Sequence, residues 1–137
     1  NVCLLNRLRD GCENVRPEFL DFCVRSILEN VDCSEGIIYA SLGCGKLYFD
    51  WELLERLVHT EGVKVKEAWL VEQFGMEYKE TNVARVAFAS WFSEAGIDVR
   101  AFHSPEYLSE WLRESPSADR AHVLLECDTE YIVGGPE

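Results

Sequence analysis

The sequence predicts a three-layer α/β domain in which a mainly parallel sheet is packed between helices. The chain has 137 residues, of which 47% are hydrophobic, so it can bury one substantial core as a single domain. Short apolar runs alternate with amphipathic segments of helical spacing, and this alternation is typical of βαβ units with right-handed crossovers. A turn of sequence Gly43-Cys44-Gly45 separates the first apolar run from the helix expected after it.

The first expected elements are a helix and a buried strand. Pro17 suits the start of a helix, and the apolar residues of segment 19–31 recur at three- and four-residue spacing. Ser34 and Gly36 break this pattern. Residues 37–42 then form a continuous apolar run, which predicts a strand that is covered on both faces.

Two helices and a second strand are expected after the glycine turn. Asp50 can cap a helix whose apolar side includes Trp51 and Leu54. Residues 68–71 are a second buried apolar run and indicate a strand. Asn82 can cap the next helix, whose apolar side extends to a stop at Gly96.

One more helix lies between the last two expected strands. Residues 97–102 are the third strand candidate. Ser104 and Pro105 form a cap and first-turn pair for the fourth helix, because a serine hydroxyl accepts from a free backbone N–H and proline needs no donor there. Residues 122–125 indicate the fourth strand.

The glycine turn also predicts the order of the strands. Successive connections lead to opposite sides of the strand that precedes such a turn, so we expect segment 37–42 at the centre, between the second and fourth strands. Residues 1–16 are then a lead-in, residues 17–128 the core and residues 129–137 a tail of one domain.

The charge of the chain limits its partners. Thirteen basic residues stand against twenty-five acidic ones, for a net charge of -12. This charge would repel a phosphate backbone and oppose the counterion release that drives non-specific binding to DNA or RNA. We therefore expect no nucleic-acid partner and leave a protein partner as the alternative, with the oligomeric state open.

Cysteines and histidines give no metal pattern. No pair has the C-x-x-C spacing of a zinc site, and the histidines lack a partner three to five residues away, so we expect no metal. A chain with its own core does not need a disulfide framework, so free thiols are expected. The residues concerned are Cys3, Cys12, Cys23, Cys33, Cys44, Cys127, His59, His103 and His122.

Targeting signals are likewise not visible. The sequence has no run of about 18 apolar residues that could span a bilayer, and no basic start followed by an apolar stretch that would indicate a signal peptide. The first residue is Asn1 rather than methionine. We expect an acidic cytoplasmic protein that neither spans nor binds a membrane.

One stretch carries a family resemblance. The residues Ser-Leu-Gly-Cys-Gly-Lys-Leu-Tyr-Phe-Asp at positions 41–50 resemble the first motif of the class I S-adenosylmethionine-dependent methyltransferases, a Rossmann-like family. The expected order of elements over residues 17–128 is similar to that family too. The resemblance implies S-adenosylmethionine as the cofactor, held at a loop formed by Gly43, Cys44 and Gly45. Leu47 stands where the usual loop has its third glycine, and Ser41 where the family commonly has an acid.

The resemblance also implies cofactor contacts after the second and third strands. Glu72 follows the second strand, at the position where the family's acid holds the ribose hydroxyls, and a carboxylate can accept both hydroxyl protons. Ser104 or Glu106 follows the third strand, where the family has an adenine-side polar residue. Each position also has a structural interpretation, in which Glu72 is a solvent-facing acid and Ser104 a helix cap.

The residues beside the loop allow further chemistry. Cys44 precedes an expected helix start, where a thiolate is favoured, but no histidine partner is indicated, so we expect a plain loop cysteine rather than a nucleophile. Tyr48, Phe49 and Trp51 suit stacking on a base, or they anchor the helix in the core. Gly43 and Gly45 suit either contact with a ligand or a sharp strand-to-helix turn.

These observations favour a methyltransferase-like domain that works as a binding or interaction module and not as an enzyme. Nine residues follow Asp128, so we expect the family's later strands and its acceptor site to be missing. The first alternative is an S-adenosylmethionine-dependent methyltransferase of minimal size, or a fragment of one, with catalytic residues unassigned. The second is a nucleotide-binding regulator, although Lys46 follows Gly45 without the P-loop pattern of glycines and hydroxyl.

Overall fold

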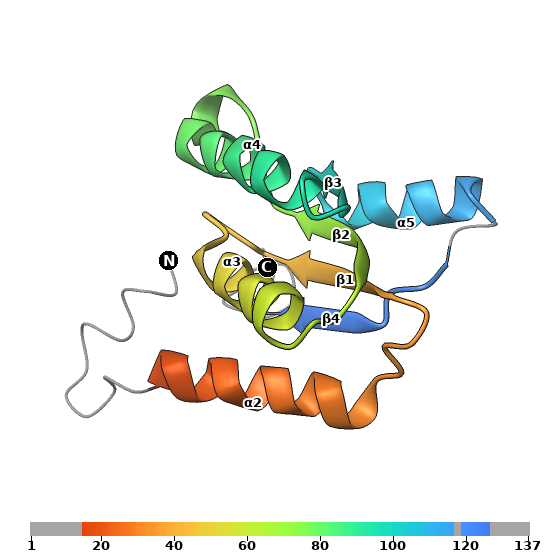
Figure 1. The fold of residues 1–137 in the computed structure, drawn as a ribbon. Helices are drawn as coiled ribbons and strands as arrows, with labels where there is room; N and C mark the ends of the chain where they lie inside the picture. The colour runs from red at the N-terminus through yellow and green to blue at the C-terminus, as the bar shows by residue number, and fades with distance from the viewer. Residues whose placement is uncertain (1–14, 117–118, 127–137) are drawn as a thin grey trace.

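Four parallel strands form one sheet in the computed structural model, which describes residues 15–116 and 119–126 (Figure 1). The strand order is β3-β2-β1-β4. Each pairing between neighbours is parallel, and Tyr39 of β1 lies opposite Ala68 of β2 and Val123 of β4. The strands are β1 (Ile37–Leu42), β2 (Val65–Val71), β3 (Asp98–Phe102) and β4 (Val123–Glu126).

Helices cover both faces of this sheet. On one face lie α2, α3 and α4, and α5 lies on the other (Figure 1). The connections from β1 to β2 and from β2 to β3 step in the same direction, so right-handed crossovers place α3 and α4 on the same face. The connection through α5 returns across the sheet to β4 and therefore uses the opposite face. The helices are α2 (Val15–Asn30), α3 (Tyr48–Glu55), α4 (Lys79–Ser93) and α5 (Pro105–Glu114).

The core is divided by the sheet into a large and a small cluster. The large cluster joins α2, α3 and α4 to the strands through Val24, Leu53, Phe88 and Tyr39, among others. The small cluster is built on Ile38, Ala40 and Trp69, and half-buried side chains of α5 pack against it. The side chains of one strand alternate between the two clusters, as expected for strands covered on both faces.

The predicted three-layer architecture and strand order are confirmed. Segment 37–42 is the central strand, with β2 on one side and β4 on the other. The second strand begins at Val65, three residues earlier than predicted, and the last runs from Val123 to Glu126. Ser104 caps α5, because its hydroxyl accepts a 3.3 Å hydrogen bond from the N–H of Tyr107.

Two predicted helix caps are wrong. Asp50 does not cap α3, which begins at Tyr48 after Leu47, so Asp50 lies inside the first turn and is only 3% exposed. Asn82 does not cap α4, which begins at Lys79; its side chain accepts instead from Arg85. In both cases the acceptor finds another donor, and the helix begins earlier than the side-chain pattern predicts.

Leu47 is the residue directly before α3, and its backbone conformation sets where this helix begins. Its backbone has φ 67°, in the left-handed region that favours glycine, and its side chain is 1% exposed in the large core cluster. Leu47 therefore combines a glycine-like backbone with a buried leucine side chain. Left-handed backbone costs a non-glycine residue about 1–2 kcal/mol, which burial of a leucine side chain offsets.

Two short helical turns lie after α3 and before α4. After Glu55 the helix continues as a π-helical turn, η1 (Arg56–Thr60), and a 3₁₀ turn, η2 (Met76–Tyr78), precedes α4. Most of the predicted lead-in 1–16 and the whole predicted tail 129–137 lie outside the described residues.

Candidate functional site

The glycine loop lies where β1 ends and turns into α3. Gly43 and Gly45 both have positive φ, 66° and 55°, so this turn requires residues without a Cβ. The N–H groups of Gly43 and Cys44 both donate to the carbonyl oxygen of Val71, at 2.9 and 3.3 Å. These hydrogen bonds hold the loop against the carboxyl end of the neighbouring strand β2.

Glu72 contacts this loop directly. It follows β2, and its Oε2 accepts a 2.7 Å hydrogen bond from the N–H of Gly45, while its Oε1 accepts from the N–H of Gln73 at 3.0 Å. The structure thus brings together four of the five predicted cofactor residues, namely Gly43, Cys44, Gly45 and Glu72. The loop N–H groups of residues 43–45 all donate to acceptors of the protein itself.

Ser104 lies apart from these four residues. It follows β3, which is separated from β1 by the whole width of β2. Neighbouring strands are about 4.8 Å apart, so the ends of β1 and β3 are separated by about 10 Å. The ring of His103, the residue before Ser104, packs edge to face on Phe74 and on Tyr107 at this end of the sheet. The Ser104 hydroxyl is already used in capping α5, as its structural interpretation requires.

A buried polar cluster lies directly beneath the loop. The hydroxyl of Tyr39 donates to Oδ1 of Asp50 at 2.5 Å, and both residues are buried, as is Ser41. Burial raises the pKa of Asp50, although hydrogen bonds from Tyr39 and Ser41 oppose that change. Burial also raises the pKa of Tyr39, and the charge of Asp50 adds to the effect. Because they are buried, these groups are not accessible to a reactant at the carboxyl ends of β1 and β2.

The thiol of Cys44 belongs to the same region. Burial raises its pKa, and the negative charges of Asp50 and Glu72 raise it further. The thiol is therefore neutral at physiological pH, and a neutral thiol is a poor nucleophile. The preference for a plain loop cysteine agrees with this environment. Of the other cysteines, Cys23 and Cys33 are half-buried against the large core cluster, and Cys3, Cys12 and Cys127 lie outside the described residues.

The histidines serve separate local contacts. His59 is exposed and lies 3.8 Å from Glu55 on the same helix. His122 lies at the start of β4, where its Nδ1 accepts from the N–H of Ile38. Within residues 15–116 and 119–126, no group of three or more histidine, cysteine, aspartate or glutamate side chains is placed to hold a metal ion.

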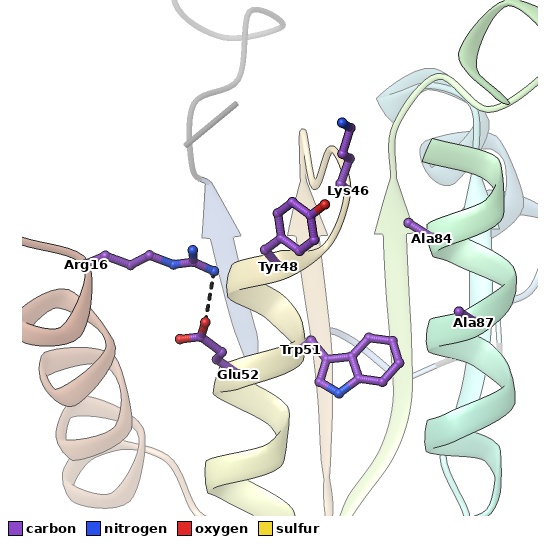
Figure 2. A pocket seen from close by; sticks show the side chains of 7 residues that line it. All are labelled: Arg16, Lys46, Tyr48, Trp51, Glu52, Ala84 and Ala87. Carbon is purple, nitrogen blue, oxygen red and sulfur yellow. Dashed lines mark ion pairs between the residues drawn. The ribbon is translucent and has the colours of Figure 1, made fainter. Parts of the chain in front are cut away.

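A groove of about 590 Å³ lies beside the glycine loop, on the face covered by α2, α3 and α4 (Figure 2). Its volume is in the range of ligand sites, about 300–1,000 Å³. Figure 2 shows α3 between the other two helices, with the Trp51 ring directed toward α4. The lining residues are Arg16, Lys46, Tyr48, Trp51, Glu52, Ala84 and Ala87.

Aromatic packing fixes one wall of this groove. The Trp51 ring packs edge to face on Phe88 and Phe92, with centroids 5.7 and 5.5 Å away, and stacks on Trp91 at 6.1 Å. The indole N–H of Trp91 donates to Glu55. Tyr48, also in the lining, is 53% exposed. Contacts on several sides hold Trp51 in one orientation beside the small side chains of α4.

Two of these lining residues, Tyr48 and Trp51, are predicted site candidates, but the sequence does not predict the groove. Tyr48 and Trp51 were expected to stack on a base or to anchor α3, together with Phe49. Phe49 is a core anchor, with 5% exposure and a stacked contact to Phe19 at 5.2 Å, and the half-buried Trp51 also packs against the large core cluster. The remaining signal is the pair Ala84 and Ala87, whose small side chains leave space on α4. Their meaning depends on which helix lies opposite, and the sequence does not give that.

Comparisons with protein-family models, with curated proteins and with solved structures give no significant match. Among the helices of the described ranges, none has the length and apolar character needed to cross a membrane. The parallel four-stranded sheet with helices on both faces is the Rossmann-like architecture that the sequence predicted.

Proposed function

We propose that this chain is a methyltransferase-like binding or interaction module that does not catalyse methyl transfer. The observation that carries the proposal is the internal use of the glycine loop. The N–H of Gly45, which would otherwise face a ligand, donates to Glu72, and the N–H groups of Gly43 and Cys44 donate to Val71. A cofactor that needed these donors, or the whole Glu72 carboxylate, would have to displace contacts already made within the protein.

The chemistry beside the loop supports the same proposal. Catalysis of methyl transfer requires a nucleophilic acceptor held in line with the donated group, and a base where the acceptor carries a proton. Three side chains beside the loop could in principle serve as such a base or nucleophile. They are Cys44, whose pKa is raised, and Asp50 with Tyr39, which are buried and hydrogen-bonded to each other. None of the three is both accessible and activated.

Two alternatives remain as second candidates. The contact between Gly45 and Glu72 at the carboxyl ends of β1 and β2 favours an S-adenosylmethionine site, since glycine and acid are adjacent where such a cofactor would lie. The same crevice would suit a nucleotide in a regulatory role. Both alternatives require small-molecule binding at the loop, and the interaction module does not.

Calorimetry of the 137-residue chain with S-adenosylmethionine, S-adenosylhomocysteine, NAD and ATP separates these functions. We expect no binding of any of the four compounds at about 1 mM. A titration at that concentration detects any complex with a binding free energy stronger than about 4 kcal/mol. Binding of either adenosyl compound would contradict the proposal and favour the methyltransferase; binding of ATP or NAD would favour the nucleotide regulator.

A matched pair of variants locates any binding that is found. Gly45→Val should abolish binding at the loop while secondary structure persists. Gly62→Val is the control, because Gly62 also has a positive φ of 72° but has open space around it. Loss of binding in both variants would indicate general backbone strain, whereas survival in both would place the ligand elsewhere.

A further inference from the structure

The groove between α2, α3 and α4 has the features of a docking site for an apolar chain segment. Its wall is Trp51, held by three other aromatic rings, and its floor on α4 is formed by Ala84 and Ala87 (Figure 2). Small side chains opposite a fixed aromatic ring leave room for branched aliphatic side chains. Apolar grooves of this kind are used to bind segments that present a row of aliphatic anchors.

The chain itself enters at one end of this groove. Arg16, the second residue of α2, is one of the lining residues, and its guanidinium contacts Glu52 of α3 at 3.2 Å. Residues 1–14 precede it and lie outside the described part of the chain. These residues are therefore attached at the mouth of the groove, and no long linker has to be ordered when they bind.

The composition of this N-terminal segment suits the groove. Its first nine residues include three leucines, Leu4, Leu5 and Leu8, and two arginines, Arg7 and Arg9, with no acid. Leucines at spacings of one, three and four residues fit the apolar stripe of an amphipathic helix. Asp10 and Gly11 follow, and this dipeptide favours a reversal of the chain between the leucines and α2.

The length of the segment is sufficient. Leu8 precedes Arg16 by eight residues, which span at most about 28 Å when extended. The groove crosses from α2 over α3 to α4, and packed helices have axes about 8–10 Å apart, so this path is about 20 Å. The leucines can therefore reach Trp51 and the alanines of α4 without any movement of the helices.

Two carboxylates beside the groove are exposed enough to accept hydrogen bonds from the arginines of the segment. Glu52 and Glu80 lie at its margin, and their side chains are 52% and 78% exposed. Each already contacts one cation, Arg16 or Lys46, but an exposed carboxylate has acceptor sites for more than one donor. Arg7 and Arg9 would meet these carboxylates while the leucines enter the groove.

We propose that the segment 2–9 of this chain docks in the groove, with Leu4, Leu5 and Leu8 against Trp51, Ala84 and Ala87. Tethering makes modest affinity sufficient. A short flexible connection gives an effective concentration on the order of 1 mM, so an intrinsic dissociation constant of about 0.1 mM leaves the segment docked about nine-tenths of the time. This proposal goes beyond the function proposed above and does not depend on whether the glycine loop binds a cofactor.

Cleavage of the Arg7–Leu8 bond by trypsin in the full chain tests the proposal. A docked segment is cut only when it is released, so we expect Ala87→Trp, which fills the groove, to increase the initial cleavage rate about tenfold over the wild type. Val86→Trp is the matched control, because Val86 is its neighbour on α4, is 52% exposed and does not line the groove. We expect wild-type cleavage in that variant.

The other outcomes each contradict the proposal. Equal cleavage rates in the wild type and Ala87→Trp would show that the groove is open in the isolated chain and available to a foreign partner. Protection that grows with protein concentration would assign the docked segment to a second copy. Faster cleavage in both tryptophan variants would indicate a loss of fold, which far-ultraviolet circular dichroism checks independently.

A second measurement detects docking without a groove variant. Replacing Leu4, Leu5 and Leu8 with glutamate in the full chain should shift the indole N–H resonance of Trp51 in a ¹⁵N correlation spectrum. Trp69 and Trp111 are internal controls, because they pack against each other on the α5 face. Unchanged Trp51, or equal shifts at all three tryptophans, would overturn the proposal.

Discussion

Asp50 combines a charged side chain with almost complete burial. Its carboxylate accepts from Tyr39 beneath the glycine loop, at the carboxyl end of the central strand. Burial disfavours the charged form and raises the pKa of Asp50 above its ordinary value of 3.8, because the hydrogen bonds from Tyr39 and Ser41 offset only part of the lost hydration. The start of α3 therefore carries a titrating group that affects folding.

The first prediction is the pH dependence of the Asp50→Asn variant. A raised pKa means that the folded chain retains a proton which the unfolded chain releases, between pH 3.8 and the folded pKa. Across that window the wild type should lose unfolding free energy relative to Asp50→Asn as the pH rises. Above it, Asp50→Asn should be at least as stable, because its amide oxygen can still accept from Tyr39.

Urea unfolding of both proteins from pH 4 to pH 8 measures this difference. Comparing the two chains cancels the contributions of the other carboxylates. If the wild type instead gains stability relative to Asp50→Asn as the pH rises, the hydrogen bonds outweigh burial and the pKa of Asp50 is lowered.

Among the elements, β4 is held to the central strand by an unusual pair of contacts. The N–H of Ile38 donates to Nδ1 of His122 at 2.9 Å, and the N–H of His122 donates to the carbonyl oxygen of Ile38 at 2.9 Å. Ile38 is fully buried, so its N–H depends on the imidazole as acceptor. One side chain thus fixes where β4 begins to pair with β1.

The second prediction concerns removal of that acceptor. His122→Ala should destabilise the domain by about 1–3 kcal/mol, because a buried donor is left without a partner. His122→Asn is the matched control, since its Oδ1 lies close to the position of Nδ1 and can accept the same hydrogen bond. Urea unfolding gives the stabilities, and hydrogen exchange at the Ile38 amide locates the effect; equal exchange in all three proteins would contradict this role.

The order of strands and helices could be predicted because apolar periodicity reports burial directly. The run at residues 37–42 is buried on both sides, and the glycine turn after it marks the change of connection direction. Helix starts were less predictable. Asp50 and Asn82 have the right chemistry for caps, but each finds a donor elsewhere, and the buried, left-handed Leu47 sets the start of α3.

The candidate site also has one part that the sequence predicts and one part that it does not. Parallel strands end at one edge of the sheet, so the proximity of Glu72 to the glycine loop follows from the predicted topology. The hydrogen bond from the Gly45 N–H to the Glu72 carboxylate could not be predicted in this way, because it depends on the side-chain conformation of Glu72. The groove was not predictable, because Arg16, Trp51 and Ala87 come from three helices whose packing is not encoded in any one segment.

At the scale of the whole molecule, the glycine loop and the groove are neighbours, because Lys46 follows the loop and lines the groove. At the strand ends, the N–H groups of the glycine loop donate to acceptors within the protein. The groove lies between α2, α3 and α4, and its lining combines Tyr48, Trp51 and two alanines with three charged side chains. This arrangement is the basis of the proposal that the domain binds a chain segment through its helical face and does not catalyse methyl transfer.

Methyl transfer is the most direct measurement of that claim. The purified 137-residue chain is incubated with labelled methyl donor and pools of protein, RNA and small-molecule acceptors, beside the same chain carrying Glu72→Ala. Positioning both reactants can lower a barrier by about 7–11 kcal/mol, and under the proposed function this domain does not position them. We predict no labelling above that of a reaction without protein; reproducible labelling that Glu72→Ala abolishes would contradict the account and identify the domain as a methyltransferase.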